Sequence, residues 1–289
     1  SALRFKCIIL IMDINSDNNS GKKFNFDSFS NLDFYRNVNS QLLDLADIDK
    51  SKKIVDLGCG NGGITEMILS KVSDVSKVVI YAVDSSSTMI SLALKRFGDR
   101  KDVFINYIQS EAQNLHENLK EKVDTVVYCN SIHYVPEKES VLRQIGDGLS
   151  EGGVLAFNTS FFDGAHPKET ELFLRKWMMK SLRVLRNEYN IKPVKSKVQS
   201  RIQLTPENYE DIVVKSGFSV KKKTIKNIKV PLDGWYEISS FKDWIEGVLP
   251  GVPLDIGKKV LQDTVTNLFK ELNISTLDRK WLSIVASKS

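Results

Sequence analysis

Residues 53–63 of this chain read KIVDLGCGNGG, and this stretch decides the fold. Its apolar start is typical of a buried strand. The four glycines that follow, between positions 58 and 63, predict a turn whose backbone N–H groups can approach a ligand closely. A helical pattern comes next, with Ile64, Met67 and Ile68 on one face. Strand, glycine turn and helix together indicate a nucleotide-binding α/β unit.

Further apolar runs predict that this unit is part of a larger sheet. Four of them follow within the first 160 residues, separated by helical patterns, and two come later. Strands that alternate with helices indicate a doubly wound, mostly parallel sheet of α/β class, here with seven strands. Besides the first strand, the predicted strands cover residues 78–83, 103–108, 124–129, 154–159, 218–228 and 281–286.

The helical patterns divide the chain into four segments. Long helices are expected at residues 167–189, 239–248 and 254–272, inserted around the late strands. We expect them to pack together over the carboxyl ends of the strands as a lid. The predicted segments are an N-terminal arm and mobile lead-in (1–30), a cofactor-binding core (31–160), a lid-helix insertion (161–204), and the C-terminal part of the core (205–289) with a second lid insertion at 235–275.

Composition excludes several classes of protein. Hydrophobic residues make up 42% and charged residues 27% of the chain, which is ordinary for a globular domain. No apolar run approaches the roughly 20 residues that span a bilayer. The three cysteines, Cys7, Cys59 and Cys129, show no metal-ligand spacing, so we expect no metal site and a reduced, cytoplasmic setting.

The net charge of +5 is unevenly distributed. Residues 175–229 carry fifteen Lys or Arg against four acids, hence +11. Two interpretations stay open. The charges form a solvated surface, with the lysines at 221–223 on an edge strand that resists aggregation, or they form a basic face for an acidic partner such as a carrier protein.

The choice of nucleotide depends on an acid before the turn. Gly58, Gly60 and Gly63 satisfy the G-x-G-x-x-G pattern of dinucleotide sites. Asp56, however, precedes them, and its carboxylate would repel a pyrophosphate but pair with an ammonium group or a bound water. The first strand also begins late, at residue 53. An adenosine ligand with a cationic amino-acid part fits better, and S-adenosylmethionine is such a ligand.

At this point the sequence resembles the class I S-adenosylmethionine-dependent methyltransferases, which have a Rossmann-like fold. The resemblance rests on VDLGCGNG (55–62), YAVDSS (81–86), EAQNL (111–115) and NSIHYV (130–135). It implies that Asp84 accepts hydrogen bonds from the ribose hydroxyls. It further implies that Glu111, in place of the usual Asp, reads the adenine amino group, and that the main chain at Asn130 holds the methionine amino group.

These motifs yield a set of candidate cofactor-binding residues. Three carry a plainer alternative: Asp84 as a helix cap, Glu111 as an exposed acid and Met89 as a core residue. The full set is Tyr35, Asp56, Gly58, Cys59, Gly60, Asn61, Asp84, Ser85, Met89, Glu111, Ala112 and Asn130.

The expected acceptor is a small, largely apolar metabolite, methylated on O, N or C. His133 is the candidate catalytic base, because it follows the fourth strand, with a locally hydrogen-bonded histidine as the alternative. The lid is aromatic, and Tyr134, Phe161, Trp177 and Trp235 are the candidate substrate contacts, although such helices are often simply core. The exit at 130–133 lacks the Asn/Asp-Pro-Pro-aromatic sequence of amide and exocyclic-amine methyltransferases.

Two other functions remain as alternatives. A carrier-protein-bound or nucleic-acid substrate would use the basic region 175–229. A non-catalytic binding module would keep the cofactor fold without the reaction.

Overall fold

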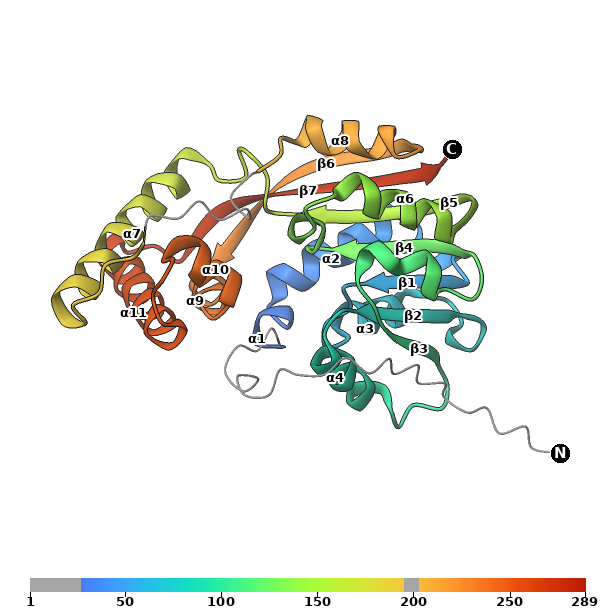
Figure 1. Ribbon diagram of the computed structural model, residues 1–289, viewed down its shortest axis with the longest axis horizontal. Helices are drawn as coiled ribbons and strands as arrows, with labels where there is room; N and C mark the ends of the chain where they lie inside the picture. Colours follow the sequence, from blue (N-terminus) through green and yellow to red (C-terminus); the bar gives the residue numbers. More distant parts are fainter. Residues whose placement is uncertain (1–26, 195–202) are drawn as a thin grey trace.

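A computed structural model describes residues 27–194 and 203–289 of the chain (Figure 1). Most of the predicted N-terminal segment (1–30) therefore lies outside the described residues, and so does Cys7. None of the helices in the described ranges combines the length and apolar character that a membrane-spanning helix requires.

The sheet has seven strands in the order β3-β2-β1-β4-β5-β7-β6, which confirms the predicted α/β fold. The first five strands are parallel to one another, whereas β7 is antiparallel to both of its neighbours. The strands are β1 (Lys53–Leu57), β2 (Val79–Asp84), β3 (Phe104–Gln109), β4 (Val123–Cys129), β5 (Leu149–Thr159), β6 (Phe218–Pro231) and β7 (Thr276–Lys288).

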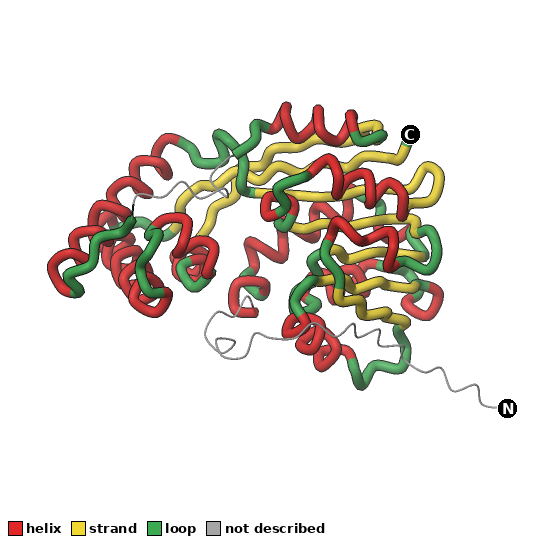
Figure 2. Tube along the Cα trace, in the orientation of Figure 1, coloured by secondary structure: helices red, strands yellow, loops and turns green. Residues whose placement is uncertain are grey.

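Helices cover both faces of the sheet, as the tube view shows (Figure 2). Successive strand residues point to opposite faces. Ile54 therefore packs with α2 and α3, whereas Val55 packs with α5, α6 and α8 on the other side. These helices are α2 (Asp33–Leu45), α3 (Gly63–Lys71), α5 (Leu115–Asn118), α6 (Lys138–Gly148) and α8 (Pro206–Lys215), with α1 (Asp27–Ser30), α4 (Ser87–Phe97) and the short 3-10 turns η1 (Ile48–Lys50), η2 (Val75–Lys77), η3 (Ala112–Asn114) and η4 (Ile132–Tyr134) between.

A second group of helices, here called the helical lobe, gathers at the end where β6 stops and β7 starts (Figure 1). It consists of α7 (Lys168–Glu188), α9 (Leu232–Ile238), α10 (Lys242–Val248) and α11 (Leu254–Leu272). Their buried apolar residues belong to the same core cluster as α2 and α3. The division of the chain into arm, core and two lid insertions stays a prediction.

One helix of the lobe was not expected from the sequence. Helix α9 contains the pair Asp233-Gly234, which favours a turn over a helix. Gly234 is buried, and a Cβ there would come within 2.6 Å of Val230 and 2.8 Å of Phe34. Tight packing of the helix against β6 and α2 therefore selects glycine and overrides its low helix propensity.

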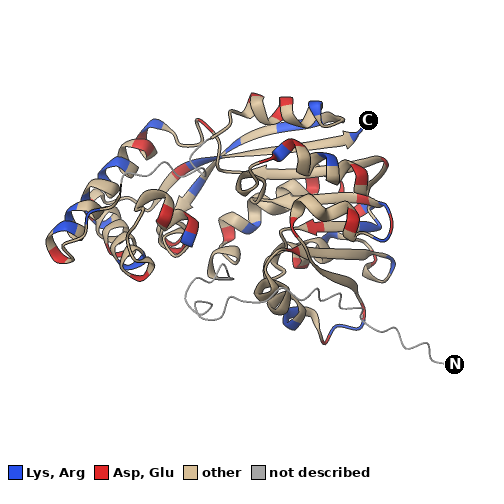
Figure 3. Cartoon of the chain, in the orientation of Figure 1, with Lys and Arg blue, Asp and Glu red and all other residues tan. Residues whose placement is uncertain are grey.

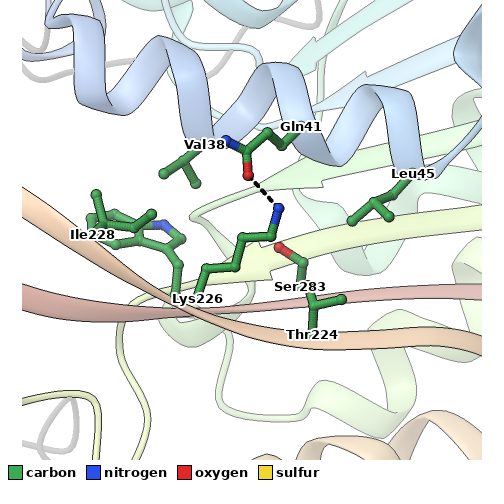
Figure 4. Close-up of a pocket in the computed structure, with 8 residues that line it drawn as sticks. Val38, Gln41, Leu45, Thr224, Lys226, Ile228 and Ser283 are labelled. Atoms are coloured by element: carbon green, nitrogen blue, oxygen red, sulfur yellow. Dashed lines mark hydrogen bonds between the residues drawn. The ribbon is translucent and has the colours of Figure 1, made fainter.

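Helix α2 is fixed to the sheet at two places. Towards β6, Val38, Gln41 and Leu45 border a hollow of only about 10 Å³, and Lys226 donates a 2.6 Å hydrogen bond to Gln41 Oε1 (Figure 4). This hollow is too small for a ligand other than a water molecule. It marks a packed contact between α2 and the edge of the sheet.

The second place is a buried cluster of amide side chains centred on Asn39. Its Oδ1 accepts from Nδ2 of Asn158 (2.8 Å) and of Asn130 (3.3 Å), and its Nδ2 donates to the Tyr35 carbonyl (2.9 Å). Asn158 Oδ1 accepts the backbone N–H of Asn130 (3.0 Å), and Trp281 Nε1 donates to Asn130 Oδ1 (2.8 Å). The cluster joins α2 to the carboxyl ends of β4 and β5 and to β7.

We expect Asn39→Ala to lower the free energy of unfolding by about 1–3 kcal/mol, because it leaves the buried Nδ2 groups of Asn130 and Asn158 without an acceptor. Denaturant unfolding measures this change. Asn37→Ala, on the exposed face of the same helix, is the control and should stay within about 0.5 kcal/mol of the wild type. Equal losses in both variants would contradict a special role for the cluster.

Candidate active site

A cavity of about 360 Å³ opens at the carboxyl ends of β1, β2 and β4, where parallel α/β sheets bind their ligands. We call it the glycine-loop cavity. Eight of the predicted cofactor-binding residues line it, namely Tyr35, Gly58, Cys59, Gly60, Asn61, Asp84, Met89 and Asn130. Its other lining residues, Ser30, Gly63, Ile64, Cys129, Ser131 and Asp243, were not among the predicted cofactor contacts, and Tyr134 was predicted to contact the substrate.

The glycine turn is held against β2 by backbone hydrogen bonds. The N–H groups of Gly58 and Cys59 both donate to the Val83 carbonyl, at 2.7 and 3.0 Å. Gly62 has φ of +89°, and a Cβ there would come within 2.6 Å of the Phe97 ring, so both conformation and packing require glycine. The turn is thereby fixed before any ligand arrives.

Asp84 ties this turn to the next strand end. Its Oδ2 accepts the Gly60 N–H and its Oδ1 accepts the Ser86 N–H, each at 2.9 Å. Burial raises the pKa of this carboxyl, and the two N–H donors oppose that rise. Each oxygen keeps a further lone pair, so the carboxylate can still accept hydrogen bonds from a diol in the cavity. The side chain that caps α4 is that of Ser86, which accepts the Met89 N–H. Capping therefore does not prevent Asp84 from binding a ligand.

Asp56 is placed differently from the sequence prediction. It is fully buried and is not part of the cavity lining. Oδ2 accepts from Thr65 Oγ1 on α3 at 2.6 Å, and Oδ1 has no partner among the described residues. Burial raises its pKa to about 7. The acid therefore lies beneath the glycine turn, on the α3 side of the sheet, and does not face a ligand directly.

The third motif also stands outside the cavity lining. Ser85, Glu111 and Ala112 are close to the carboxyl ends of β2 and β3, but none of them lines the cavity. Glu111 is exposed, at the start of the turn η3. The predicted adenine contact of Glu111 stays a prediction.

A second cavity, of about 340 Å³, adjoins the first and is here called the lobe cavity. The two share Tyr134 and Asp243 in their walls. The lobe cavity lies between the exits of β4 and β5 and the helices α9 and α10. Its lining consists of His133, Tyr134, Phe161, His166, Gln203, Ile238, Phe241, Asp243, Trp244, Gly247 and Val248.

His133 stands in this cavity between two aromatic rings. Its ring centroid is 4.1 Å from that of Phe161, nearly parallel, and 4.1 Å from that of Tyr134. Nδ1 is 3.3 Å from Thr159 Oγ1, and the buried Nε2 has no partner in the described part of the chain. Burial, with help from the positive charges of Arg279 and Lys138, lowers its pKa to about 3. The imidazole is therefore neutral at physiological pH.

Two predicted substrate contacts lie away from both cavities. Trp177 is fully buried and its Nε1 donates to the Leu261 carbonyl (3.1 Å) and to Thr264 Oγ1 (3.0 Å). Trp235 packs perpendicular to it, with ring centroids 6.3 Å apart. Neither ring lines the glycine-loop cavity or the lobe cavity, because both belong to the buried core that includes the lobe helices. Tyr134 and Phe161 do line the lobe cavity.

The sequence did not point to Asp243 as a site residue, and His166, which precedes a proline, had a weaker claim than His133. Asp243, in the first turn of α10, is shared by both cavities, and only the start of a short amphipathic helix marks it in the sequence. Among residues 27–194 and 203–289, no group of three His, Cys, Asp or Glu side chains is arranged to hold a metal ion.

Comparison with known proteins agrees with this geometry. Residues 55–155 match the family model described as a methyltransferase domain. This range runs from β1 into β5 and contains the glycine turn and Asp84.

Residues 55–155 are a class I S-adenosylmethionine-dependent methyltransferase domain.

Curated relatives of this methyltransferase domain carry methyltransferase names. The malonyl-[acyl-carrier protein] O-methyltransferase of Acetivibrio thermocellus is 28% identical over 137 residues, 47% of this chain and 45% of that protein. The ubiquinone biosynthesis O-methyltransferase of Shewanella sp. is 27% identical over 108 residues, 37% of this chain and 43% of that protein. The matched part thus spans less than half the length of each of these relatives.

Solved structures share the fold over most of the chain. A phosphoethanolamine N-methyltransferase of Haemonchus contortus, in complex with S-adenosylhomocysteine, has a TM-score of 0.53 at 17% identity, with 87% of this chain and 52% of that one covered. The cyclopropane synthase MmaA2 of Mycobacterium tuberculosis has a TM-score of 0.53 at 13% identity, with 88% and 84% covered. Since the two are named for different reactions, the likeness shows the fold alone.

Asp56 makes the stability of the fold depend on pH. Its pKa is about 7 in the folded chain and about 3.9 in an unfolded one. Between these values the folded state binds the extra proton, so its contribution to stability falls as the pH rises and is constant above about 7. We expect Asp56→Asn to gain stability over the wild type across this range, by up to ~4 kcal/mol. Denaturant unfolding from pH 4 to 8 measures the difference in unfolding free energy between the variant and the wild type. A difference that does not change with pH would contradict the raised pKa of Asp56.

Proposed function

We propose that this chain transfers the methyl group of S-adenosylmethionine to a small acceptor that binds in the lobe cavity. The observation that carries the proposal is the pair of adjoining cavities with Tyr134 and Asp243 in both walls. A cofactor in one cavity and an acceptor in the other would meet at this boundary. Both volumes lie within about 300–1,000 Å³, the range usual for small-molecule sites.

The residues of the glycine-loop cavity fit the cofactor. Asp84 would accept hydrogen bonds from the ribose hydroxyls, with its carboxylate already oriented by the N–H groups of Gly60 and Ser86. Met89 offers an apolar surface to the adenine ring. Tyr35 and Asn130, held by the Asn39 cluster, would border the amino-acid part. When bound, S-adenosylmethionine supplies a methyl group on a positively charged sulfur.

The chain would contribute mainly alignment and exclusion of water. Holding two reactants in line is worth on the order of 7–11 kcal/mol. His133 is neutral, so its Nε2 can hold the proton of an acceptor hydroxyl or amine, but its pKa of about 3 makes it a weak base. Its stacking between Tyr134 and Phe161 fixes the ring for this positioning role.

Methyl-labelled S-adenosylmethionine incubated with the chain and a cell extract tests the proposal. After ultrafiltration and chromatographic removal of unreacted S-adenosylmethionine, label is expected in other small molecules of the filtrate. New label only in the retained macromolecules would contradict a small acceptor, and label that stays entirely in S-adenosylmethionine would contradict methyl transfer.

We expect Asp84→Asn to weaken S-adenosylhomocysteine binding roughly tenfold to a hundredfold, because charge-assisted hydrogen bonds contribute about 1.5–3 kcal/mol. Asp124→Asn is the matched control. Asp124 also accepts two backbone N–H bonds, from Lys52 and Lys53, but at the opposite, amino end of the sheet. Calorimetry should find that Asp124→Asn binds S-adenosylhomocysteine as tightly as the wild type. An equal loss of affinity in both variants would show that Asp84 only stabilises the loops and does not contact the ligand.

A second candidate substrate is an acceptor attached to an acidic carrier protein. On the outer face of α7, Met179 and Leu182 are 62% and 43% exposed and border an open hollow of about 680 Å³. Arg183, Arg186 and Lys192 surround it without an acid in the lining. One relative is named a malonyl-[acyl-carrier protein] O-methyltransferase, which agrees with such a surface.

The described charges of the basic region 175–229 lie on separate elements. Most of them are on α7 in the lobe or on β6 at the edge of the sheet (Figure 3). Lys223 pairs with Glu210 and Lys180 pairs with Glu271. This division disfavours a continuous track for nucleic acid and leaves the α7 face as the candidate for a protein partner.

We expect Arg183→Glu together with Arg186→Glu to raise the KM for a carrier-bound acceptor severalfold at low salt, because opposite charges steer association. The effect should disappear at high ionic strength. Lys221→Glu with Lys222→Glu, on β6, is the control. A KM that changes neither with these charge reversals nor with the salt concentration would contradict this second candidate.

A further inference from the structure

A buried arginine lies directly behind the wall of the lobe cavity. Arg279, on β7, is only 4% exposed. Its guanidinium carbon is 4.6 Å from the ring centroid of Phe161, a cavity-lining residue, and 5.6 and 5.9 Å from those of Trp281 and Trp235. The charge is thus enclosed by aromatic rings, one of which forms the cavity wall.

This charge has no counter-ion in the described part of the chain. Nη2 donates to the Ser160 carbonyl at 3.1 Å, Nε has no partner, and no carboxylate of residues 27–194 and 203–289 forms an ion pair with it. Burial lowers its pKa to about 10. A buried charge without a partner is unfavourable, so its retention in the fold requires an explanation.

Other buried nitrogens near Arg279 and in the cavity wall lack partners as well. The indole N–H groups of Trp235, whose ring contacts Arg279, and of Trp244 have no acceptor in the described residues, and Nε2 of His133 and of His166 has no hydrogen-bond partner there. Trp244 and both histidines line the cavity. Indole and guanidinium groups can only donate hydrogen bonds. Since buried donors in native proteins are normally satisfied, this excess indicates a ligand that brings acceptors.

We propose that the lobe cavity binds an acceptor molecule through a carboxylate, with a hydrogen bond from Trp244 Nε1 and with Arg279 as the compensating charge. The inference rests on the proposed function in naming this occupant as the methyl acceptor. A carboxylate supplies several lone pairs to the lining donors. In a poorly solvated site its attraction to a guanidinium behind one ring is screened far less than in water.

A cationic occupant fits the same walls less well. Tyr134, Phe161 and Trp244 offer aromatic faces that attract cations, and Asp243 adds an acid. The Phe161 ring, however, already carries Arg279 against it. The positive charge of Arg279 contributes to the lowered pKa of His133 and of His166. Asp243 is exposed and lies at the boundary with the glycine-loop cavity.

Three probes that differ in charge test this inference. Phenylacetate, phenylacetamide and phenethylamine share one ring, and their binding is measured by calorimetry with S-adenosylhomocysteine present. We expect phenylacetate to bind at least tenfold more tightly than the amide, and the amine not to bind. An amide or amine that binds as tightly, or failure of both phenylacetate and hexanoate to bind at millimolar concentration, overturns the inference.

Variants connect this preference to the named groups. Arg279→Met should abolish the preference for the carboxylate and change the affinity for S-adenosylhomocysteine less than twofold. Arg279→Lys keeps the positive charge and should therefore retain most of the preference for the carboxylate. Trp244→Phe should weaken phenylacetate severalfold and leave the amide unchanged. Arg143→Met, on the exposed face of α6, is the control. A preference that survives Arg279→Met overturns the role of this charge.

The outcome is separable from that of the proposed function, because binding is measured without methyl transfer. A carboxylate preference in a chain that methylates no acceptor would sink the proposed function alone. Methyl transfer to acceptors without any carboxylate preference would sink this inference alone.

Discussion

The arrangement of both cavities depends on the buried amide cluster around Asn39. Parallel strands end in loops whose backbone groups are no longer paired by the sheet, and some other group must hold them. Here Asn158 Oδ1 accepts the N–H of Asn130, and Asn39 joins both side chains to α2. Asn130 itself has φ of +49°, a conformation that asparagine tolerates better than most residues. The exit of β4, and with it the segment that carries His133 and Tyr134, takes its direction from this cluster.

The two cavities are built in different ways from this common edge. Hydrogen bonds from backbone N–H groups fix the glycine-loop cavity, since Gly58 and Cys59 donate to the Val83 carbonyl and Gly60 donates to the Asp84 carboxylate. The lobe cavity is closed by side chains from α9 and α10, helices that pack on the ends of β6 and β7. In such a site the cofactor contacts depend mainly on the backbone, and the acceptor contacts depend on side chains of the lobe. Proteins of this fold can therefore differ in their acceptor without a change in the cofactor contacts.

Local sequence patterns were enough to predict the fold and most of the glycine-loop cavity. Glycines after an apolar run, and an acid at the end of the next one, determine backbone geometry within a few residues. The misplaced residues depend on orientation in space. Strand alternation turns Asp56 towards Thr65, and it does not line the glycine-loop cavity. Amphipathic patterns cannot separate a core face from a cavity face, so Trp177 and Trp235 were assigned to substrate. Arg279 is one of three consecutive charged residues (278–280) in β7, and only tertiary packing reveals that it is buried.

The shared wall of Tyr134 and Asp243 has a consequence for energetics. Tyr134 is 50% exposed, so an occupant on either side would cover part of the same ring. If one occupant changes the orientation of this ring, the wall of the other cavity changes as well. Linkage then requires that the cofactor change the affinity for the acceptor by the same factor as the acceptor changes the affinity for the cofactor. In the proposed function, the sulfonium and its neutral thioether product would differ by one charge beside Asp243, and this difference would let the affinity at the boundary depend on which of the two is bound.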